Sequence, residues 1–190
     1  PLFILAQNEV CFEIEPNPTP FDPALNNFTK YVNVLDCFHI YAESSISDSK
    51  VLHAASVAAE LLDNNEDGIV DDSLLEFELR SAEAMMPLFA SEWSPAMDDV
   101  WDYYEGCVSA ALFNNEIDPS QPGHWGDDAS VEEILHTINH CGHVEIYPTT
   151  FSLWPNSSLL TDAMDIARGS QFINIPNQYP EEAWYHYDDW

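Results

Sequence analysis

Four prolines within eight residues constrain the start of this chain more than any other sequence feature. They are Pro16, Pro18, Pro20 and Pro23. Proline fixes the backbone φ angle and has no N–H group to donate, so residues 16–23 are expected to stay out of a sheet. We expect an extended polyproline-type spacer that reaches about 25 Å at ~3.1 Å per residue. The sequence thus predicts three parts: residues 1–15, the spacer over 16–23 and one globular domain over 24–190.

The segment before the spacer has the pattern of a β arm. Residues 2–5 are apolar at every position, which suits a strand buried on both faces. Val10, Phe12 and Ile14 then alternate with less apolar residues, as in a half-buried strand. Such a segment needs a sheet edge, either in its own domain or in a neighbouring molecule. Because the spacer lets the arm leave its own body, we expect residues 1–15 to donate a strand and mediate head-to-tail self-assembly into a filament or matrix.

The charge balance decides which partners this chain can have. It holds 34 acidic and 4 basic residues, a formal net charge of -30. A surface of this kind repels phosphate backbones and anionic lipids, so nucleic-acid partners are excluded and membrane insertion is not expected. It attracts cations instead. Apolar residues make up 46% of the chain, which is enough to build a core.

Beyond the spacer the hydrophobic periodicity is mostly helical. A helix is expected to begin at Asp22-Pro23 and to place Leu25, Phe28, Val32 and Leu35 on one face. Short strands are expected at residues 38–42 and 172–175, and a long loop at 114–128. The fold class is therefore α-rich α+β, a helical body with a few short strands and a detached N-terminal β arm. Further helices are expected over residues 49–62, 73–86, 94–111, 130–141 and 158–168.

Residues 63–72 carry the most specific motif. Oxygen-bearing side chains stand at alternate positions, and Gly68 at the sixth position permits the sharp turn that a chain makes around a hard cation. With a helix on each side, the pattern is that of an EF-hand-like calcium loop. The expected calcium ligands are Asp63, Asn65, Asp67, Asp71 and the backbone carbonyl of Ile69.

The twelfth position of this loop departs from the EF-hand pattern. It is Leu74, where an EF-hand has a bidentate Glu; Asp72 or Glu76 could substitute. The departure lowers affinity, so we expect a structural calcium site and not a sensor. The alternative is a solvated acidic turn between two helices.

Several segments resemble a group of uncharacterised secreted acidic proteins with an EF-hand-like or thrombospondin-type-3-like D-x-N-x-D-G loop. The resemblance spans roughly residues 30–190 and leaves the N-terminal arm outside. It implies an extracellular domain with an acidic metal loop and carries no activity. The matching segments are His53-Ala54-Ala55, residues 61–65, Asp67-Gly68, Asp71, residues 132–136, residues 163–168, Tyr179-Pro180 and residues 187–189.

Cysteines and sequons also favour secretion. Four widely spaced cysteines allow two disulfides with three possible connectivities, or four buried free thiols in a reducing compartment. Asn27 and Asn156 stand in N-glycosylation sequons. The disulfide candidates are Cys11, Cys37, Cys107 and Cys141.

The helix expected over residues 130–141 contains a candidate transition-metal pair. His136 and His140 are four residues apart and lie opposite the apolar stripe, so they either meet solvent or line a second contact. A zincin needs a glutamate where this chain has Thr137, and Glu133 is expected to form a capping box with Ser130. A metal-dependent hydrolase using this helix is therefore one alternative function.

A carbohydrate-binding module is the other alternative. The C-terminal tail is rich in aromatic residues, whose rings could stack on sugars. Alternatively, these aromatic side chains pack in the core or at an interface. These residues are Trp184, Tyr185, Tyr187 and Trp190. The preferred function remains a secreted, glycosylated, calcium-stabilised structural protein.

Overall fold

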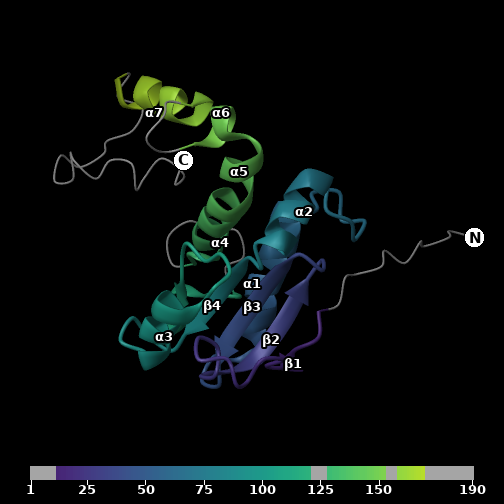
Figure 1. Cartoon of the computed structure of the whole chain (residues 1–190), viewed down its shortest axis with the longest axis vertical. Helices are drawn as coiled ribbons and strands as arrows, with labels where there is room; N and C mark the ends of the chain where they lie inside the picture. Colours follow the sequence, from purple (N-terminus) through teal and green to yellow (C-terminus); the bar gives the residue numbers. More distant parts are fainter. Residues whose placement is uncertain (1–11, 121–127, 153–157, 170–190) are drawn as a thin grey trace, which may run out of the picture.

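The computed structural model describes residues 12–120, 128–152 and 158–169. The fold is α+β and richer in helix than in strand, as the sequence predicts. The fold is built on a five-stranded mixed sheet in the order β1-β2-β3-β4-β5, and the C-terminal helices extend away from it toward the top of the view (Figure 1). The strands are β1 (Glu15–Pro16), β2 (Phe28–Val34), β3 (Phe38–Glu43), β4 (Met85–Phe89) and β5 (Leu112–Phe113).

The helices differ widely in length. The predicted helices over 49–62, 130–141 and 158–168 and the strand over 38–42 are confirmed within a few residues. No helix in the described ranges is long and apolar enough to cross a bilayer. The helices are α1 (Asp48–Leu62), α2 (Ser73–Ser81), α3 (Pro95–Tyr103), η1 (3-10, Asn114–Glu116), α4 (Ser130–Ile138), η2 (π, Asn139–His143), α5 (Val144–Ile146), α6 (Pro148–Phe151) and α7 (Leu159–Gly169).

The sheet combines a hairpin with two parallel crossovers. Strands β2 and β3 are antiparallel and are joined through Leu35 and Asp36, which both have positive φ angles. The Cys37 N–H donates to the Val34 carbonyl and closes this tight turn. Strand β4 then pairs parallel with β3 after a crossover that contains α1 and α2, and β5 pairs parallel with β4 after α3.

Both faces of the sheet are covered. On one face, alternate residues of β2, β3 and β4 pack against α1, α2 and α4. On the other face, a cluster rich in aromatic rings packs against α3 and the segment before β2. The second cluster contains Ala24, Leu25, Phe28, Tyr31, Tyr41, Met85, Phe89, Ala96 and Val100.

The N-terminal segment is not detached in its described part, so this element of the predicted fold class is wrong. Glu15 pairs with Tyr31 and Pro16 with Lys30, which makes β1 an edge strand of the chain's own sheet. Phe12 packs against the main core. An edge strand tolerates proline because one side of its backbone needs no partner. Residues 1–11 of the predicted arm lie outside the described residues.

The predicted proline spacer is a compact loop instead of an extended rod. The buried Asn17 side chain donates from Nδ2 to the Leu25 carbonyl at 2.7 Å and to the Phe28 carbonyl at 3.0 Å. Its Oδ1 accepts from the Thr19 N–H at 2.8 Å. A buried amide needs hydrogen-bond partners, and Asn17 finds them at Leu25, Phe28 and Thr19. These bonds hold the proline-rich segment against the start of β2.

Three predicted helices meet strands or end early. The region expected to be a helix from Asp22 is a series of turns followed by β2. Strand β2 has buried residues on both of its faces, so its sequence lacks the strict alternation that marks a strand. The helix expected over 73–86 ends at Ser81, and β4 follows with Pro87 inside it. The helix expected to reach residue 111 ends at Tyr103.

Three of the four basic side chains hold backbone segments together. Lys30 Nζ donates to the Ile46 carbonyl, and Lys50 Nζ to the Asn114 carbonyl. Arg80 Nε donates to the Asp36 carbonyl at 2.8 Å. Lys30 also pairs with Asp48 at 2.7 Å, and Arg80 with Glu76 at 2.6 Å. These three cations of an acidic chain therefore serve its internal structure.

Gly142 lets the π-helix η2 approach α2 closely. A methyl group at this position would lie 2.4 Å from Leu75 Cδ1 and 3.1 Å from Leu79 Cδ2. Both leucines are buried, so they have little room to move.

We therefore predict that Gly142→Ala destabilises the protein. Overpacking costs about 1–3 kcal/mol, and the gain in helix propensity returns about 1 kcal/mol, which leaves a net loss of about 1 kcal/mol in urea unfolding. In a Leu75→Ala background the added methyl group has space, so the same change should be neutral or stabilising. An equal loss in both backgrounds would contradict this packing.

Candidate functional site

The acidic loop lies between α1 and α2, at the midpoint of the crossover that joins β3 to β4. Helix α1 ends at Leu62, whose carbonyl accepts from the Asp71 N–H at 2.9 Å and brings the two ends of the loop together. Gly68 has a φ of 85° and Glu66 a φ of 60°. These two left-handed residues give the sharp turn that the motif predicts.

Asp63 organises this loop from the inside. Asp63 is only 4% exposed. Its two carboxylate oxygens accept from the backbone N–H groups of Asp67 at 3.2 Å and Gly68 at 2.7 Å. A carboxylate held in this way fixes the backbone at the sixth position of the loop. Asp67 Oδ1 accepts from the Ile69 N–H at 3.0 Å, so it also orients the turn.

Asp71 closes the loop from the other end. Its Oδ2 accepts from the Asn64 N–H at 3.0 Å and from Asn64 Nδ2 at 3.1 Å, and its Oδ1 accepts from Asn65 Nδ2 at 3.1 Å. The hydrogen bonds from Asn64 are the main cause that holds the pKa of the Asp71 carboxyl below its usual value. Asp71 is therefore ionised over the physiological pH range.

Neither predicted substitute for the twelfth position is available. Asp72 caps α2, where its Oδ1 accepts from the Leu74 N–H at 2.9 Å, and its Oδ2 accepts from the Tyr147 hydroxyl at 2.7 Å. Glu76 pairs with Arg80. The loop thus offers its ligands without a bidentate carboxylate.

Among the described residues, no group of three or more His, Cys, Asp or Glu side chains is placed so that it could hold a metal ion. Calcium ligation by this loop would therefore rest on the Asn65 side chain and the Ile69 carbonyl as well as on carboxylates, the mixed oxygen set that calcium accepts.

The Asp72–Tyr147 hydrogen bond joins the loop to the C-terminal helices. Because Tyr147 donates to it, the pKa of Asp72 is lowered and that of Tyr147 is raised. The His143 ring stacks on Phe151 with centroids 4.7 Å apart. Burial lowers the pKa of His143. These contacts anchor α5 and α6 beside the start of α2.

The predicted histidine pair is split between two kinds of helix. His136 is half-buried on α4, whereas His140 is exposed on the π-helix η2. The wider π turn changes the angle between successive residues, so two residues four apart no longer lie on one face as they do in an α-helix. The capping box is wrong as well, because Ser130 Oγ donates to Asp128 and α4 has no side-chain cap.

Two buried polar atoms next to this π turn are unsatisfied. Thr137 Oγ1 and Asn139 Nδ2 have no hydrogen-bond partner among the described atoms. The sequence places Thr137 among the histidines, but in the structure its residue is fully buried. The predicted apolar stripe itself is confirmed, since Ile134, Ile138 and Cys141 are buried.

A buried histidine–carboxylate pair was not predicted from the sequence. His53 Nε2 on α1 lies 2.7 Å from Asp128 Oδ2, and the side chains are 8% and 1% exposed. Asp128 Oδ1 also accepts from Ser130 Oγ at 2.7 Å and from the Asp118 N–H at 3.2 Å. Only the Asp-x-Ser spacing before α4 hinted at this network.

This network is arranged for structure and not for acyl transfer. A serine nucleophile needs a hydrogen bond to the histidine base, whereas the Ser130 hydroxyl donates to the carboxylate. Burial raises the pKa of Asp128, but hydrogen bonds from Ser130, His53 and the Asp118 N–H outweigh it and hold the pKa below its usual value. The network therefore ties α1 to Asp118 and to the start of α4.

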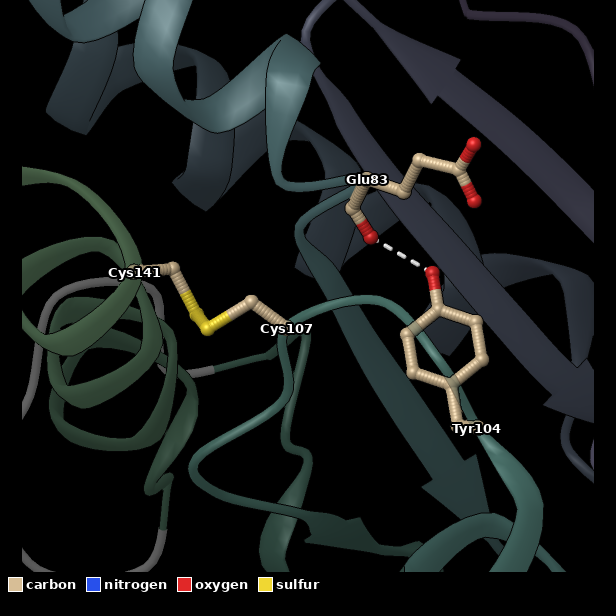
Figure 2. Close-up of a disulfide and its surroundings, with 4 residues drawn as sticks. All are labelled: Glu83, Tyr104, Cys107 and Cys141. Carbon is tan, nitrogen blue, oxygen red and sulfur yellow. Dashed lines mark hydrogen bonds between the residues drawn. A yellow bond between two sulfur atoms is a disulfide. The ribbon is translucent and has the colours of Figure 1, made fainter.

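A disulfide connects the segment after α3 to the π-helix η2. Cys107 and Cys141 are bonded, with Cα atoms 5.8 Å apart and a sequence separation of 34. Figure 2 shows this bridge beside Tyr104, whose hydroxyl donates to the Glu83 carbonyl. The bridge fastens η2 to the loop that follows α3.

The remaining candidates divide between described and undescribed residues. Cys37 is a free buried thiol, which corrects its assignment to a bridge in this structure. Asn27 is exposed and donates to Asp99 at 2.7 Å. Cys11, Asn156, the strand over 172–175 and the aromatic residues Trp184, Tyr185, Tyr187 and Trp190 lie outside the described residues.

Comparison with known proteins gives no relative for this chain. No family model, no curated protein and no solved structure matches it. The function must therefore be inferred from the residues and contacts of the chain itself.

We predict that Asp128→Asn lowers the free energy of unfolding by about 2 kcal/mol at neutral pH, because hydrogen bonds to a buried charge are lost. The folded-state pKa lies below the unfolded value of about 3.9, so this stabilisation is present above that value and is lost as the pH falls through the folded-state pKa. Urea unfolding at pH 7 and pH 3 measures it. The exposed Asp102→Asn on α3 is the control, and a pH-independent deficit would contradict the role of the charge.

Proposed function

We propose that this chain is a secreted structural domain whose acidic loop, residues 63–72, binds calcium. The observation that carries the proposal is the buried Asp63 carboxylate, which holds the N–H groups of Asp67 and Gly68 and so shapes the loop around its own oxygens. This is the arrangement in which the carbonyl of Ile69 and the side chains of Asn65 and Asp71 can turn toward one ion.

Charge supports a cation at this place. The chain carries a formal charge of -30, and Lys30, Lys50 and Arg80 already donate to backbone carbonyls elsewhere. The loop contains five carboxylates within ten residues and no basic residue. Their mutual repulsion destabilises the turn, and a divalent ion would relieve it.

The proposed role of the ion is structural. Without a bidentate carboxylate at Leu74, affinity should fall in the range of extracellular modules, with a Kd of about 10⁻⁴–10⁻³ M. The loop is the centre of the β3–β4 crossover, and Asp72 connects it to Tyr147 in the C-terminal helices. A bound ion would therefore stabilise the junction between the sheet and these helices.

Secretion is supported by two further observations. A disulfide joins Cys107 to Cys141, and such bonds persist in oxidising compartments. Asn27 of the first sequon is exposed, so a glycan there would displace only its hydrogen bond to Asp99. Extracellular calcium is in the millimolar range that a weak structural site needs.

We predict that calcium raises the thermal stability of the protein. At ten times the Kd the gain is about 1.4 kcal/mol, and Asp67→Asn should reduce it because the substitution removes one ligand charge. Asp67 is exposed and keeps an oxygen for the Ile69 N–H when it becomes Asn. Calorimetric titration and thermal unfolding with calcium or chelator provide the measurement.

The control for this prediction is Asp102→Asn, which makes the same change in net charge on exposed α3. If both variants lose affinity equally, the binding is diffuse attraction to a polyanion. If the parent shows no calcium-dependent shift, the loop is a solvated acidic turn and the proposal fails.

Head-to-tail self-assembly remains a second proposal, in a narrower form. Residues 12–16 lie in the chain's own fold, where Phe12 packs on the core and β1 pairs with β2. A donated strand would therefore be drawn from residues 1–11, with the apolar Leu2–Leu5 run at its centre.

We predict that deleting residues 1–11 abolishes assembly and leaves the fold intact. Light scattering and electron microscopy of both chains at millimolar calcium test assembly, and circular dichroism checks the fold. Assembly of the truncated chain to the same size as the parent, or a monomeric parent, would refute the proposal.

A further inference from the structure

We propose that Tyr31 is a redox-active tyrosine, which gives an electron to a one-electron oxidant while its phenolic proton passes to His39. This inference is independent of calcium binding and of secretion. It rests on one hydrogen bond across the β2–β3 hairpin, on the shielding of the phenol, and on a comparison with tyrosines elsewhere in the fold.

Tyr31 and His39 face each other across the hairpin, on the side of the sheet that carries the aromatic cluster. Tyr31 pairs with Tyr41 in the strand register, so His39 is its diagonal neighbour on the same face. The Tyr31 hydroxyl lies 2.9 Å from His39 Nδ1, and the two ring centroids are 5.7 Å apart. The oxygen–nitrogen distance lies within the ~2.6–3.2 Å from which a positioned base takes a proton.

The Tyr31 hydroxyl is the donor of this hydrogen bond. None of the other described residues hydrogen-bonds to it, so donation to Nδ1 satisfies its proton. Burial lowers the pKa of His39, which keeps the imidazole neutral and the Nδ1 lone pair free at neutral pH. Burial also raises the pKa of Tyr31 to about 12, so the phenol keeps its proton until the electron leaves.

The reaction is a coupled transfer of one electron and one proton. A phenol that loses an electron becomes a strong acid, and a neutral imidazole in contact with it accepts the proton. The O–H bond of Tyr31 breaks, the electron reduces a metal-complex or organic-radical oxidant, and an N–H bond forms at His39 Nδ1. The products are a neutral phenoxyl radical and an imidazolium that donates to it. A one-electron reductant reverses the step, because the imidazolium returns the same proton.

The surroundings of the phenol favour a radical that persists. Tyr31 belongs to the cluster that packs against α3 and the segment before β2, and it is 9% exposed. This packing shields its ring from direct coupling with a second radical. The small exposed fraction keeps the ring near the surface, so an electron crosses only a short distance to an oxidant outside. Tyr41 flanks the ring, with centroids 5.0 Å apart.

Three other tyrosines have weaker proton acceptors than Tyr31. The Tyr104 hydroxyl donates to a backbone carbonyl, which is no base at neutral pH (Figure 2). Tyr147 donates to the Asp72 carboxylate, whose lowered pKa makes it a weaker base than an imidazole. Tyr103 is 57% exposed, and its hydroxyl meets no base among the described residues. The geometry therefore selects Tyr31 among these four.

Flash photolysis of the full chain tests the electron transfer. Photogenerated tris(bipyridine)ruthenium(III) is the oxidant, which the negative charge of the chain attracts, and chloropentaamminecobalt(III) is the irreversible electron acceptor. Absorption and electron paramagnetic resonance follow the tyrosyl radical. We expect a slowly decaying signal in the parent, loss of this slow phase in Tyr31→Phe, and its retention in the exposed control Tyr103→Phe. Circular dichroism checks the fold of each variant.

A second variant tests the proton transfer. His39→Gln keeps an acceptor for the Tyr31 hydroxyl but has no basic nitrogen. The radical should therefore form about a hundredfold more slowly, the lower end of what a positioned base contributes. In the parent the rate of oxidation should fall in D2O, because a proton moves with the electron.

Any of three results would overturn the proposal. A slow phase of equal size in Tyr31→Phe would place the radical on another residue. An unchanged rate of oxidation in His39→Gln, or in the parent transferred to D2O, would mean that His39 takes no proton. A parent without a slowly decaying tyrosyl radical would leave the Tyr31–His39 contact as a structural hydrogen bond only.

Discussion

The parallel pairing of β3 with β4 is the interaction on which the rest of the structure depends. It joins the β2–β3 hairpin to everything that follows Leu62, and its crossover contains α1, the acidic loop and α2. Parallel pairing needs a long connection and cover on both faces, and here α1 and α2 cover one face while α3 covers the other. The shape of the loop sets the position of α2 relative to α1. Because both helices pack on the sheet, the loop also affects how β3 and β4 are covered.

Repulsion among the acidic side chains opposes this fold, and a few cationic side chains stabilise it at specific contacts. With 34 acidic residues the folded state compresses many like charges. Three cationic side chains span different joints: Lys30 links β2 to the start of α1, Lys50 links α1 to η1, and Arg80 links α2 to the hairpin turn. Each donates to a carbonyl, so each bond persists even where neighbouring carboxylates are protonated. The outer surface consequently has little positive charge to offset its field.

The sequence predicted the elements whose signals are local and missed those set by long-range contacts. Helix α1 and the loop 63–72 were predictable because apolar periodicity and a glycine at a fixed position need no distant partner. Strand β2 was mistaken for a helix because Tyr31 and Val32 are buried on opposite faces, which removes the alternation that marks a strand. In the candidate site, the shape of the loop follows from the spacing of its residues. The hydrogen bond from Tyr147 to Asp72 and the His53–Asp128 pair, in contrast, each join residues 75 positions apart. No local pattern encodes such contacts.

The placement of the basic residues also determines how the protein meets proteases. An enzyme of the trypsin class inserts one Lys or Arg side chain into an acidic pocket and needs several residues of extended chain around it. Lys30, Lys50 and Arg80 lie in β2, α1 and α2, and their charged ends are bound to carbonyls of the protein itself. Cleavage at these positions must await local unfolding. At these three positions, cleavage by this protease class is thus governed by the opening of folded elements and not by the accessibility of the surface.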